Sequence, residues 1–590
     1  MRQFFKFMFA SMAGFLLALF LFVLLSIAIF SAMVSSMSSD TKVSISKNTI
    51  LEIVLDKPIE ERTSNNPLDE IDLTSFTGDK NLGLNDIVKN IEKASRDNNI
   101  SGIFLNLSSL SAGSATIEEI RNALLEFKKS KKFIYAYGED LSQGAYYLAS
   151  TADKIYLHPE GSIDFKGFRT ELMFFKGALE KLELEPQVIR HGKFKSAVEP
   201  FINDKMSPEN KEQISTLVQS FWSNFLTNIS ASRNLDIAIL QKAADDYATR
   251  EATEAKSLGF VDEIAYFDQV MDEMQKDERD PKRSVPDVIS LKKYNKVYVK
   301  AEKEFSKEKI ALIYAVGDIV TGKGSEDQIG SEKMAEVIRK ARLDSNIKAI
   351  VLRVNSPGGS AMASDVIWRE VSLARKTKPF VVSMGDYAAS GGYYISCAAD
   401  SIVAQPNTLT GSIGVFGLLL NAQKMFNNKL GITFDTVKTA RYADIGTMTR
   451  RLTAEERSLI QSQVEKIYET FITHVSEDRN LSKELVDSIG QGRIWSGTDA
   501  LSLGLIDAIG GVNTAIEIAA RMAKLDNYRV IQLPEQKEFF EKIMEDLNTE
   551  THSYFAKREL GEQYKYYEKL KSVVHNNGIQ ARIPFELEIY

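Results

Sequence analysis

One serine of this chain, Ser390, lies between small residues in a position that suits a nucleophile. Ser390 lies in the segment AASGGYY (Ala388–Tyr394), which follows an apolar run and opens a stretch of helical character. We expect the small neighbours to leave its hydroxyl exposed, and the positive end of the helix to favour negative charge beside it. A serine that only caps a helix would suit the same position. Both interpretations stay open on this segment alone.

A serine hydroxyl needs a base before it attacks, and the histidines supply no clear one. Of the five histidines, only His474 falls in the same domain-sized region as Ser390. It lies in a helical stretch (Ile460–Val475) with no evident acidic partner. A Ser-His-Asp triad is therefore not favoured.

Lysine is the remaining candidate for the base. Lys193 and Lys195 occur in the segment HGKFKSAVEPF (His191–Phe201). A solvated lysine has a pKa of about 10.4 and is a poor base at neutral pH. Burial in apolar surroundings lowers the pKa and yields a neutral amine that can accept a serine proton. Lysines in sequence are more often solvated surface residues, so the segment needs support from elsewhere.

That support comes from a duplication. At an offset of 247 positions, Ile91–Pro159 falls on Ile338–Pro406 without a gap. Gln143 stands opposite Ser390, and Lys195 has no lysine opposite it. A capping requirement would apply equally to both copies, so the loss of the serine in one copy favours chemistry. We interpret the asymmetry as one composite site built from two related domains. Identical pairs include Asp97/Asp344, Gly144/Gly391, Tyr146/Tyr393, Tyr147/Tyr394 and Asp153/Asp400.

Two further segments of the second copy fit the same chemistry. NSPGGS (Asn355–Ser360) follows an apolar run, and its glycines let backbone N–H groups point at a ligand, although a plain turn has the same pattern. No G-x-G-x-x-G pattern is present, so a dinucleotide site is not favoured. Gly411–Gly414 is matched by Gly161–Ile163, which favours a structural role for Ser412 and leaves it free to orient a base.

Apolar runs of strand length must position these segments. They occur in pairs, one member in each copy, and alternate with segments whose apolar residues lie three and four apart. Strands alternating with helices indicate an α/β fold with a mostly parallel sheet covered by helices. The predicted strands are 49–55 and 310–316, 102–107 and 349–354, and 133–137 and 380–384, with helices at 117–127 and 366–374.

The N-terminus is suited to a membrane. Phe7–Val34 carries no charge and would form a helix about 42 Å long at about 1.5 Å per residue, enough for a hydrocarbon core of about 30 Å. Arg2 and Lys6 precede it, so the positive-inside rule places the short N-terminus in the cytosol. A cleaved signal peptide is the alternative, but no clean cleavage site follows. The net charge of -7 argues against a nucleic-acid partner.

Taken together, the motifs GKFKSAVEPF (Gly192–Phe201), NSPGGS, AASGGYY and GSIGVFG (Gly411–Gly417) resemble the signal peptide peptidase A, or protease IV, family in its long, tandem-duplicated form. The resemblance implies two copies of a Clp-protease/crotonase-like domain preceded by one transmembrane helix. It also implies a serine endopeptidase with a Ser/Lys dyad that needs no metal or cofactor and degrades hydrophobic peptides, chiefly cleaved signal peptides.

Carried onto this sequence, the resemblance makes Ser390 the nucleophile and Lys195 the general base. Ser412 orients the lysine, and the backbone N–H groups of Gly359 and Gly391 form the oxyanion hole. The protein is expected to be a homotetramer in the bacterial inner membrane, with a cytosolic N-terminus and the catalytic domains outside. The expected segments are a cytosolic 1–6, an anchor at 7–34, a first copy at 45–266, a linker at 267–305, a second copy at 306–525 and a C-terminal arm at 526–590.

Two other interpretations remain. A crotonase-like acyl-CoA enzyme would use a similar pair of amides, but it needs a catalytic carboxylate and a basic patch for CoA, and gives no reason for an anchor. A non-catalytic membrane scaffold of the same fold would stand if Ser390 and Lys195 lay far apart.

Overall fold

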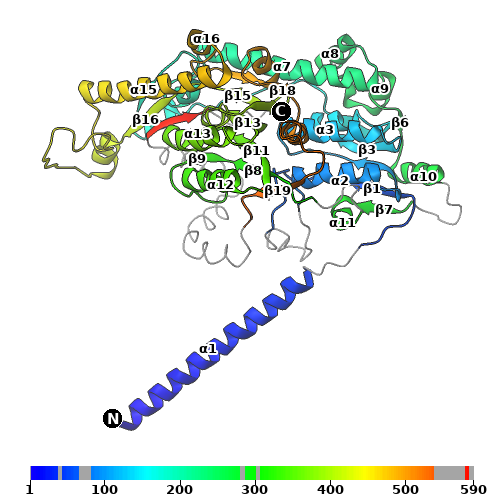
Figure 1. Cartoon of the computed structure of the whole chain (residues 1–590), viewed down its shortest axis with the longest axis horizontal. Helices are drawn as coiled ribbons and strands as arrows, with labels where there is room; N and C mark the ends of the chain where they lie inside the picture. The colour runs from blue at the N-terminus through cyan, green and yellow to red at the C-terminus, as the bar shows by residue number, and fades with distance from the viewer. Residues whose placement is uncertain are drawn as a thin grey trace.

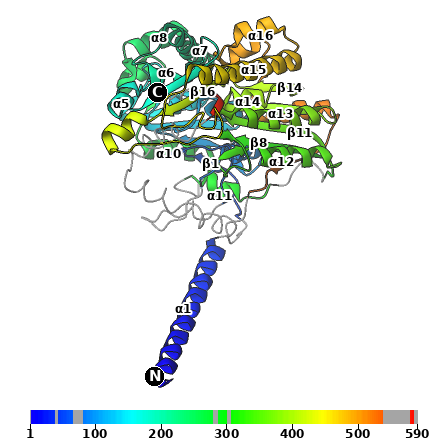
Figure 2. The same cartoon turned by 90° about the vertical axis from the view of Figure 1, so that its left-hand side faces the viewer.

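The computed structural model describes residues 2–37, 43–65, 81–278, 286–299, 306–536 and 578–583. Two α/β units lie side by side, and the long helix α1 (Arg2–Met37) projects away from both (Figures 1 and 2). The segment Gln3–Phe22 of α1 has a mean hydropathy of 2.0 and is long and apolar enough to cross a membrane. A signal sequence would pass the same test of length and composition.

The first unit is built on a parallel sheet. Its strands run in the order β6-β4-β3-β2-β1-β7. The inner strands are buried on both faces, as expected when helices cover both sides of a parallel sheet. The bounds are β1 (Thr49–Ile53), β2 (Ile100–Asn106), β3 (Phe133–Leu141), β4 (Lys154–Ile163), β6 (Glu263–Ile264) and β7 (Val288–Ser290).

The second unit repeats this sheet in the same order, β18-β14-β13-β11-β8-β19. The predicted duplication of one α/β fold is therefore confirmed. Strand β13 also pairs with β15, which continues to β17. The bounds are β8 (Lys309–Val316), β11 (Ile347–Ser356), β13 (Phe380–Ala389), β14 (Ser401–Ala404), β15 (Leu409–Gly411), β17 (Ile494–Ser496), β18 (Ala508–Ile509) and β19 (Arg529–Leu533).

A third sheet combines strands from distant parts of the chain. Its order is β10-β9-β12-β20-β16-β5. Strand β5 comes from the first copy and β20 from the C-terminal segment, whereas the others belong to the second copy. The bounds are β5 (Glu185–Arg190), β9 (Asp318–Val320), β10 (Gln328–Gly330), β12 (Gly358–Ser360), β16 (Phe416–Asn421) and β20 (Gly578–Arg582).

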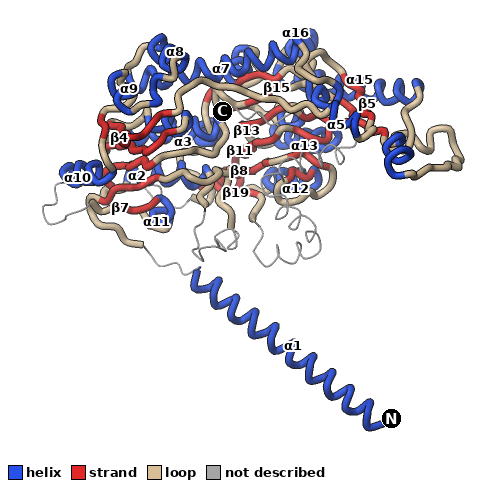
Figure 3. Tube along the Cα trace, turned by 180° about the vertical axis from the view of Figure 1, so that it is seen from behind, coloured by secondary structure: helices blue, strands red, loops and turns tan. Residues whose placement is uncertain are grey.

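Helices surround the sheets (Figure 3), and the two longest after α1, α7 (Pro208–Arg233) and α15 (Ala454–Arg479), run along the same edge of the molecule (Figures 1 and 2). Both end at a left-handed asparagine, Asn234 and Asn480. The other helices are α2 (Leu84–Arg96), α3 (Ser114–Lys128), α4 (Gln143–Ala149), α5 (Lys176–Lys181), α6 (Glu199–Ile202), α8 (Ile237–Asp245), α9 (Ala252–Ser257), α10 (Phe267–Glu278), α11 (Leu291–Asn295), α12 (Ser331–Leu343), α13 (Ala361–Arg375), α14 (Gly391–Tyr394), α16 (Lys483–Ile489), α17 (Gly497–Ser502) and α18 (Val512–Met522).

Charged side chains join the two units at a buried cluster. Arg353 of β11 lies 2.8 Å from Glu61 and 2.6 Å from Glu119, both of which belong to the first copy. All three side chains are less than 10% exposed. The opposite charges offset the desolvation of each group only while all of them are present. This cluster therefore holds the two copies in one relative position.

The predicted boundaries cut through parts of the sheets. Within 267–305, predicted as a linker, the structure places α10, β7 and α11, and β7 pairs with β1. Within 526–590, predicted as an arm, β19 pairs with β8 in the equivalent place. Most of the predicted arm, namely 537–577 and 584–590, lies outside the described residues.

Candidate active site

Lys195 and Ser390, which the sequence analysis drew from different copies, meet in the structure. Lys195 Nζ lies 2.8 Å from Ser390 Oγ, within hydrogen-bond distance. Both side chains are 0% exposed. Lys193, two residues earlier, is exposed. The structure therefore places one of the two candidate lysines at the serine and the other in solvent.

Strand β5 carries Lys195 into the second copy. It pairs antiparallel with β16, from Glu185 opposite Asn421 to Arg190 opposite Phe416. The loop after β5 then packs against the second copy so closely that a Cβ added at Gly492 would lie 2.6 Å from Lys195 Cα. Gly492 has a φ of +86°, a conformation that glycine adopts without strain.

Gln213 of α7 holds the lysine loop in place. Its amide nitrogen donates to Ser196 Oγ at 2.8 Å and to the Phe194 carbonyl at 3.2 Å. Its amide oxygen accepts from the Ile494 N–H of the second copy at 3.3 Å. One side chain thus fixes the loop against both copies.

Ser390 follows β13 directly and adopts a strained backbone conformation, with φ +55° and ψ -109°. Such a conformation costs about 1–3 kcal/mol for a residue other than glycine. Its N–H donates to the Gly411 carbonyl at 2.8 Å, and its side chain caps no helix. The capping alternative is therefore wrong.

The expectation of an exposed hydroxyl is also wrong, because both sides of Ser390 are covered. Ala389 packs in one apolar cluster with Ile583, and a Cβ added at Gly391 would lie 3.0 Å from the Ala581 carbonyl oxygen. The C-terminal segment thus lies over the serine.

Ser412 completes the surroundings of the lysine. Lys195 Nζ lies 3.0 Å from Ser412 Oγ and 3.2 Å from the Ser412 carbonyl oxygen. The Ser412 hydroxyl in turn donates to the Gly492 carbonyl at 3.3 Å. The amine nitrogen thus lies within hydrogen-bond distance of three serine oxygens, and the Ser390 hydroxyl donates to the Gly414 carbonyl at 3.2 Å.

Burial lowers the pKa of the Lys195 ammonium well below its ordinary value. The group is desolvated, and the three polar atoms around its nitrogen belong to serines. None of these three atoms carries a formal negative charge, so burial favours the neutral form. A neutral amine beside a serine hydroxyl can remove its proton and activate it as a nucleophile.

The two predicted backbone donors lie at adjoining turns. A Cβ added at Gly358 would lie 2.8 Å from the Gly391 nitrogen, so the NSPGGS loop and the start of α14 are in contact. As the first residue of α14, Gly391 has no acceptor for its N–H within its own helix. Gly359 is the middle residue of β12.

The same position in the first copy is occupied differently. Ser142 caps α4 by accepting from the Ala145 N–H. The Gln143 amide oxygen accepts from the Lys166 and Gly167 N–H groups at 3.0 and 2.9 Å, and its nitrogen donates to the Gly167 carbonyl. Gln143 therefore ties down a loop where the second copy holds Ser390.

His474 does have an acidic neighbour, which sequence reasoning missed. Its Nε2 lies 3.4 Å from Asp365, and its ring stacks on Trp368 with centroids 3.5 Å apart. Asp365 precedes His474 by more than a hundred residues, so no local pattern could reveal the pair. Ser390 Oγ instead contacts Lys195 and the Gly414 carbonyl, at 2.8 and 3.2 Å.

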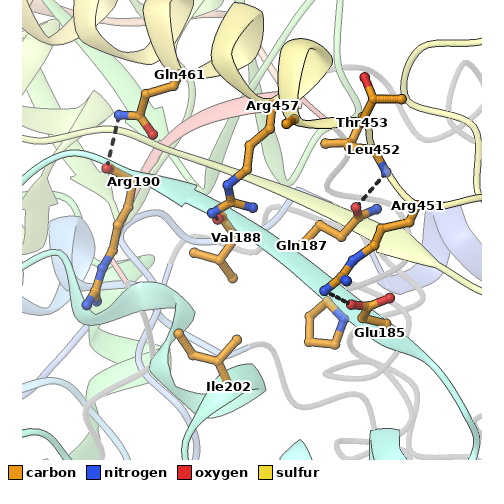
Figure 4. Close-up of a pocket in the computed structure, with 12 residues that line it drawn as sticks. Glu185, Gln187, Val188, Arg190, Ile202, Arg451, Leu452, Thr453, Arg457 and Gln461 are labelled. Atoms are coloured by element: carbon orange, nitrogen blue, oxygen red, sulfur yellow. Dashed lines mark hydrogen bonds and ion pairs between the residues drawn. The ribbon is translucent and has the colours of Figure 1, made fainter.

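Sequence reasoning also did not single out Gly414 and Gly492, whose carbonyls accept from the two serines. The glycine-rich patterns around both residues were the available signal. A hollow of about 650 Å³ lies elsewhere, between β5 and the start of α15, and Glu185, Arg190 and Arg457 help to line it (Figure 4). Within the described residues, no group of three His, Cys, Asp or Glu side chains is placed to hold a metal ion.

Comparisons with known proteins agree with this architecture. The sequence matches Peptidase family S49 over residues 126–280 and 372–526, once in each copy, and Clp protease over 301–410. It is 39% identical to Protease 4 of Salmonella typhi over 78% of this chain and 75% of that protein. It is 34% identical to the chloroplastic serine protease SPPA of Arabidopsis thaliana, over 77% of this chain and 68% of that protein.

A shorter relative covers part of the chain. The putative signal peptide peptidase SppA of Enterococcus faecium is 34% identical over 39% of this chain and 68% of that protein. These matches define a peptidase of the serine type, built on two Clp-like copies. The chain belongs to peptidase family S49, and its long relatives are SppA-type proteases.

Proposed function

We propose that this protein is a membrane-anchored serine endopeptidase that degrades hydrophobic peptides, chiefly cleaved signal peptides, with Ser390 as nucleophile and Lys195 as general base. The contact of 2.8 Å between two fully buried side chains carries the proposal. A fully buried lysine whose amine lies against serine oxygens has no evident structural benefit, because burying it costs free energy. A catalytic role accounts for that cost.

The reaction follows from the geometry. Neutral Lys195 accepts the Ser390 proton while the serine oxygen attacks a peptide carbonyl, and Ser412 holds the amine in position. The Gly359 and Gly391 N–H groups then bind the oxyanion, and each such donor is worth about 3 kcal/mol. Protonated Lys195 gives its proton to the leaving amine. A water activated by the same lysine hydrolyses the acyl-enzyme.

Membrane attachment and substrate class rest on other features. The apolar segment in α1 and the preceding Arg2 support a single-pass anchor at 7–34, with the catalytic copies outside the cytosol of a bacterial cell. The similarity to the signal peptide peptidase SppA of Enterococcus faecium supports signal peptides as substrates. A homotetramer follows from the family resemblance, and light scattering of the detergent-solubilised protein would test it.

The two rival interpretations are less favoured. The scaffold interpretation requires Ser390 and Lys195 to lie apart, which their separation of 2.8 Å does not support. The acyl-CoA interpretation requires a catalytic carboxylate. Among the described residues, the side chain within hydrogen-bond distance of Ser390 Oγ is that of Lys195.

Hydrolysis of a fluorogenic peptide of leucine and alanine residues tests the proposal. We expect Ser390→Ala and Lys195→Ala to abolish hydrolysis and the exposed neighbour Lys193→Ala to retain it. Circular dichroism of each variant controls for folding. Full activity in folded Ser390→Ala would contradict the proposal.

A further inference from the structure

The outer edge of strand β5 borders the hollow shown in Figure 4. Strand β5 ends the third sheet: β16 pairs with one side of it, and among the described residues no strand pairs with the other. The hollow of about 650 Å³ lies on that other side, between β5 and the start of α15. Its volume falls within the range of about 300–1,000 Å³ that is common for ligand sites.

The register of β5 turns two backbone N–H groups towards this outer edge. The His191 N–H donates to the Val415 carbonyl at 3.3 Å, so these two residues form a hydrogen-bonded pair. In an antiparallel ladder such pairs recur every second residue. Ile189 is therefore the next residue bonded to β16, whereas Val188 and Arg190 direct their N–H and C=O groups to the outer edge.

Side chains of α15 occupy the positions where another strand would bond. Arg457 donates to the Val188 carbonyl at 2.6 Å, and Gln461 donates to the Arg190 carbonyl at 3.5 Å (Figure 4). Peptide N–H groups can replace such donors when an extended peptide adds to a sheet edge. Pro186 on the same edge has no N–H, so the edge suits a short peptide and not a long strand.

Arginine side chains give the hollow an excess of positive charge. Arg190, Arg451 and Arg457 line it together with one acidic residue, Glu185, which lies 2.5 Å from Arg451. Arg190 and Arg457 instead donate to uncharged backbone carbonyls, and Arg190 lies 3.9 Å from Glu199, beyond hydrogen-bond distance. The protein as a whole has a net charge of -7, so this local excess indicates an anionic ligand.

Apolar side chains make up another part of the lining. Val188 of β5 and Ile202 of α6 lie on the same side of the hollow, and Leu452 lies just before α15 (Figure 4). A guanidinium binds a carboxylate through two parallel hydrogen bonds, whereas apolar walls favour apolar side chains. The surroundings therefore match a ligand that has an extended backbone, apolar side chains and a carboxylate.

We propose that this hollow is a second peptide site, which binds a short, extended apolar peptide through its carboxylate. The peptide backbone pairs with Val188 and Arg190. Its N–H replaces Arg457 at the Val188 carbonyl, and the released guanidinium binds the carboxylate. That carboxylate is either the C-terminus of the peptide or an acidic side chain near it.

The site is separate from Ser390 and binds without any reaction. The source of its ligand does rest on the proposed function, because hydrolysis of an apolar peptide leaves a product with a new C-terminal carboxylate. The second site would then hold this product on the enzyme.

Fluorescence anisotropy of the full-length Ser390→Ala protein in detergent tests binding without cleavage. The probe is Ala-Leu-Ala-Leu with fluorescein at its N-terminus and a free C-terminal carboxylate. We expect Arg457→Gln to weaken binding about tenfold, since it removes a charged hydrogen-bond donor. The control is Arg250→Gln, because Arg250 is also exposed and donates to a backbone carbonyl, that of Tyr247, outside the hollow. Equal losses in the two variants, or no loss in either, would overturn the proposal.

Two altered probes identify the carboxylate on unaltered Ser390→Ala protein. The C-terminal amide of the same peptide should bind about tenfold more weakly. An amide with glutamate as its last residue should regain affinity if an acidic side chain is accepted, and should stay weak if the C-terminus is required. Equal affinity of the apolar acid and its amide would overturn the proposal.

Photo-crosslinking locates the bound probe. A benzophenone side chain at its second position should crosslink to β5 or α6, the elements that carry Val188 and Ile202. Crosslinks confined to β12 or β16 would overturn the proposal. Wild type that hydrolyses the fluorogenic peptide without this binding would overturn the second site alone, whereas binding by an inactive wild type would overturn the proposed function alone.

Discussion

The two copies share a scaffold and differ at positions where chemistry is proposed. In each copy a tyrosine hydroxyl donates to a distant carbonyl, from Tyr146 to Phe260 and from Tyr393 to Leu505. In each copy an aspartate accepts from an N–H at the start of a central strand: Asp153 accepts from Ile134, and Asp400 accepts from Phe380. These shared contacts preserve the fold.

The two copies differ at the turn after the third strand. In the first copy α4 begins with an ordinary cap, in which Ser142 accepts from a helix N–H and Gln143 binds a loop. The second copy has Ser390 in a strained conformation that caps nothing. The same fold therefore accommodates a strained backbone at Ser390 in one copy and an ordinary helix cap at Ser142 in the other.

The largest expected effect tests this contrast directly. Ser390→Ala should lower kcat by about a millionfold, the effect typical of losing a serine nucleophile. The matched change Gln143→Ala should keep the rate within about twofold and cost about 1 kcal/mol of stability, because it removes only hydrogen bonds. Peptide hydrolysis and urea unfolding measure the two effects. A large loss of rate in Gln143→Ala would contradict the assignment of a catalytic role to Ser390 and a structural role to Gln143.

Lys195→Met should lower kcat by about a thousandfold, since the base is removed. The same change should stabilise the folded protein at neutral pH. The pKa of Lys195 is lowered in the folded state, so unfolding takes up a proton between that pKa and about 10.4, and wild-type stability rises with pH across this window.

The stability difference between Lys195→Met and wild type should therefore shrink as the pH rises from the lowered pKa towards about 10. Activity of wild type should likewise rise with pH through the lowered pKa, as the amine becomes neutral. Urea unfolding and pH–rate profiles check both, with exposed Lys193→Met as the control. A Lys195→Met protein less stable than wild type at neutral pH would contradict the expected sign.

Arg353→Met tests the joint between the copies. It leaves Glu61 and Glu119 buried without their partner, and breaking such a cluster typically costs about 3–5 kcal/mol. Asn106 holds the matched position in the first copy and only donates to Glu52 at 3.0 Å. Asn106→Ala should therefore cost about 1 kcal/mol. Similar urea midpoints for the two variants would show that the cluster does not hold the copies together.

The smallest effect concerns the serine that both copies keep. Ser412→Ala should lower kcat by about tenfold to a hundredfold, because small displacements of a catalytic group cost that much, and should leave KM nearly unchanged. Its counterpart Ser162 donates a hydrogen bond to Asp140 on the exposed side of the first copy. Ser162→Ala should therefore leave kcat and KM unchanged. An unaltered pH–rate profile and rate in Ser412→Ala would remove it from the site.

Much of this arrangement could be predicted from the sequence, because duplication supplies an internal comparison. The offset of 247 paired Gln143 with Ser390 and directed attention to the unmatched Lys195. The alternation of apolar runs also predicted the paired strands, such as β2 and β11, to within a few residues.

The rest depended on contacts between distant segments. No local pattern indicates that β5 leaves its own copy to pair with β16, or that Gly578–Arg582 enters the sheet between β12 and β16. The burial of Ser390 follows from those pairings, so it was missed with them. His474 and Asp365 were missed for the same reason, since each residue alone looks ordinary.

The distance along the chain between Lys195 and Ser390 has a consequence in time. A ribosome adds about 5–20 residues per second, so the 195 positions between them take about 10–40 s to make. Throughout that interval the first copy carries the proposed base without the proposed nucleophile. Under that proposal, the chain cannot digest its own first copy before Ser390 is made.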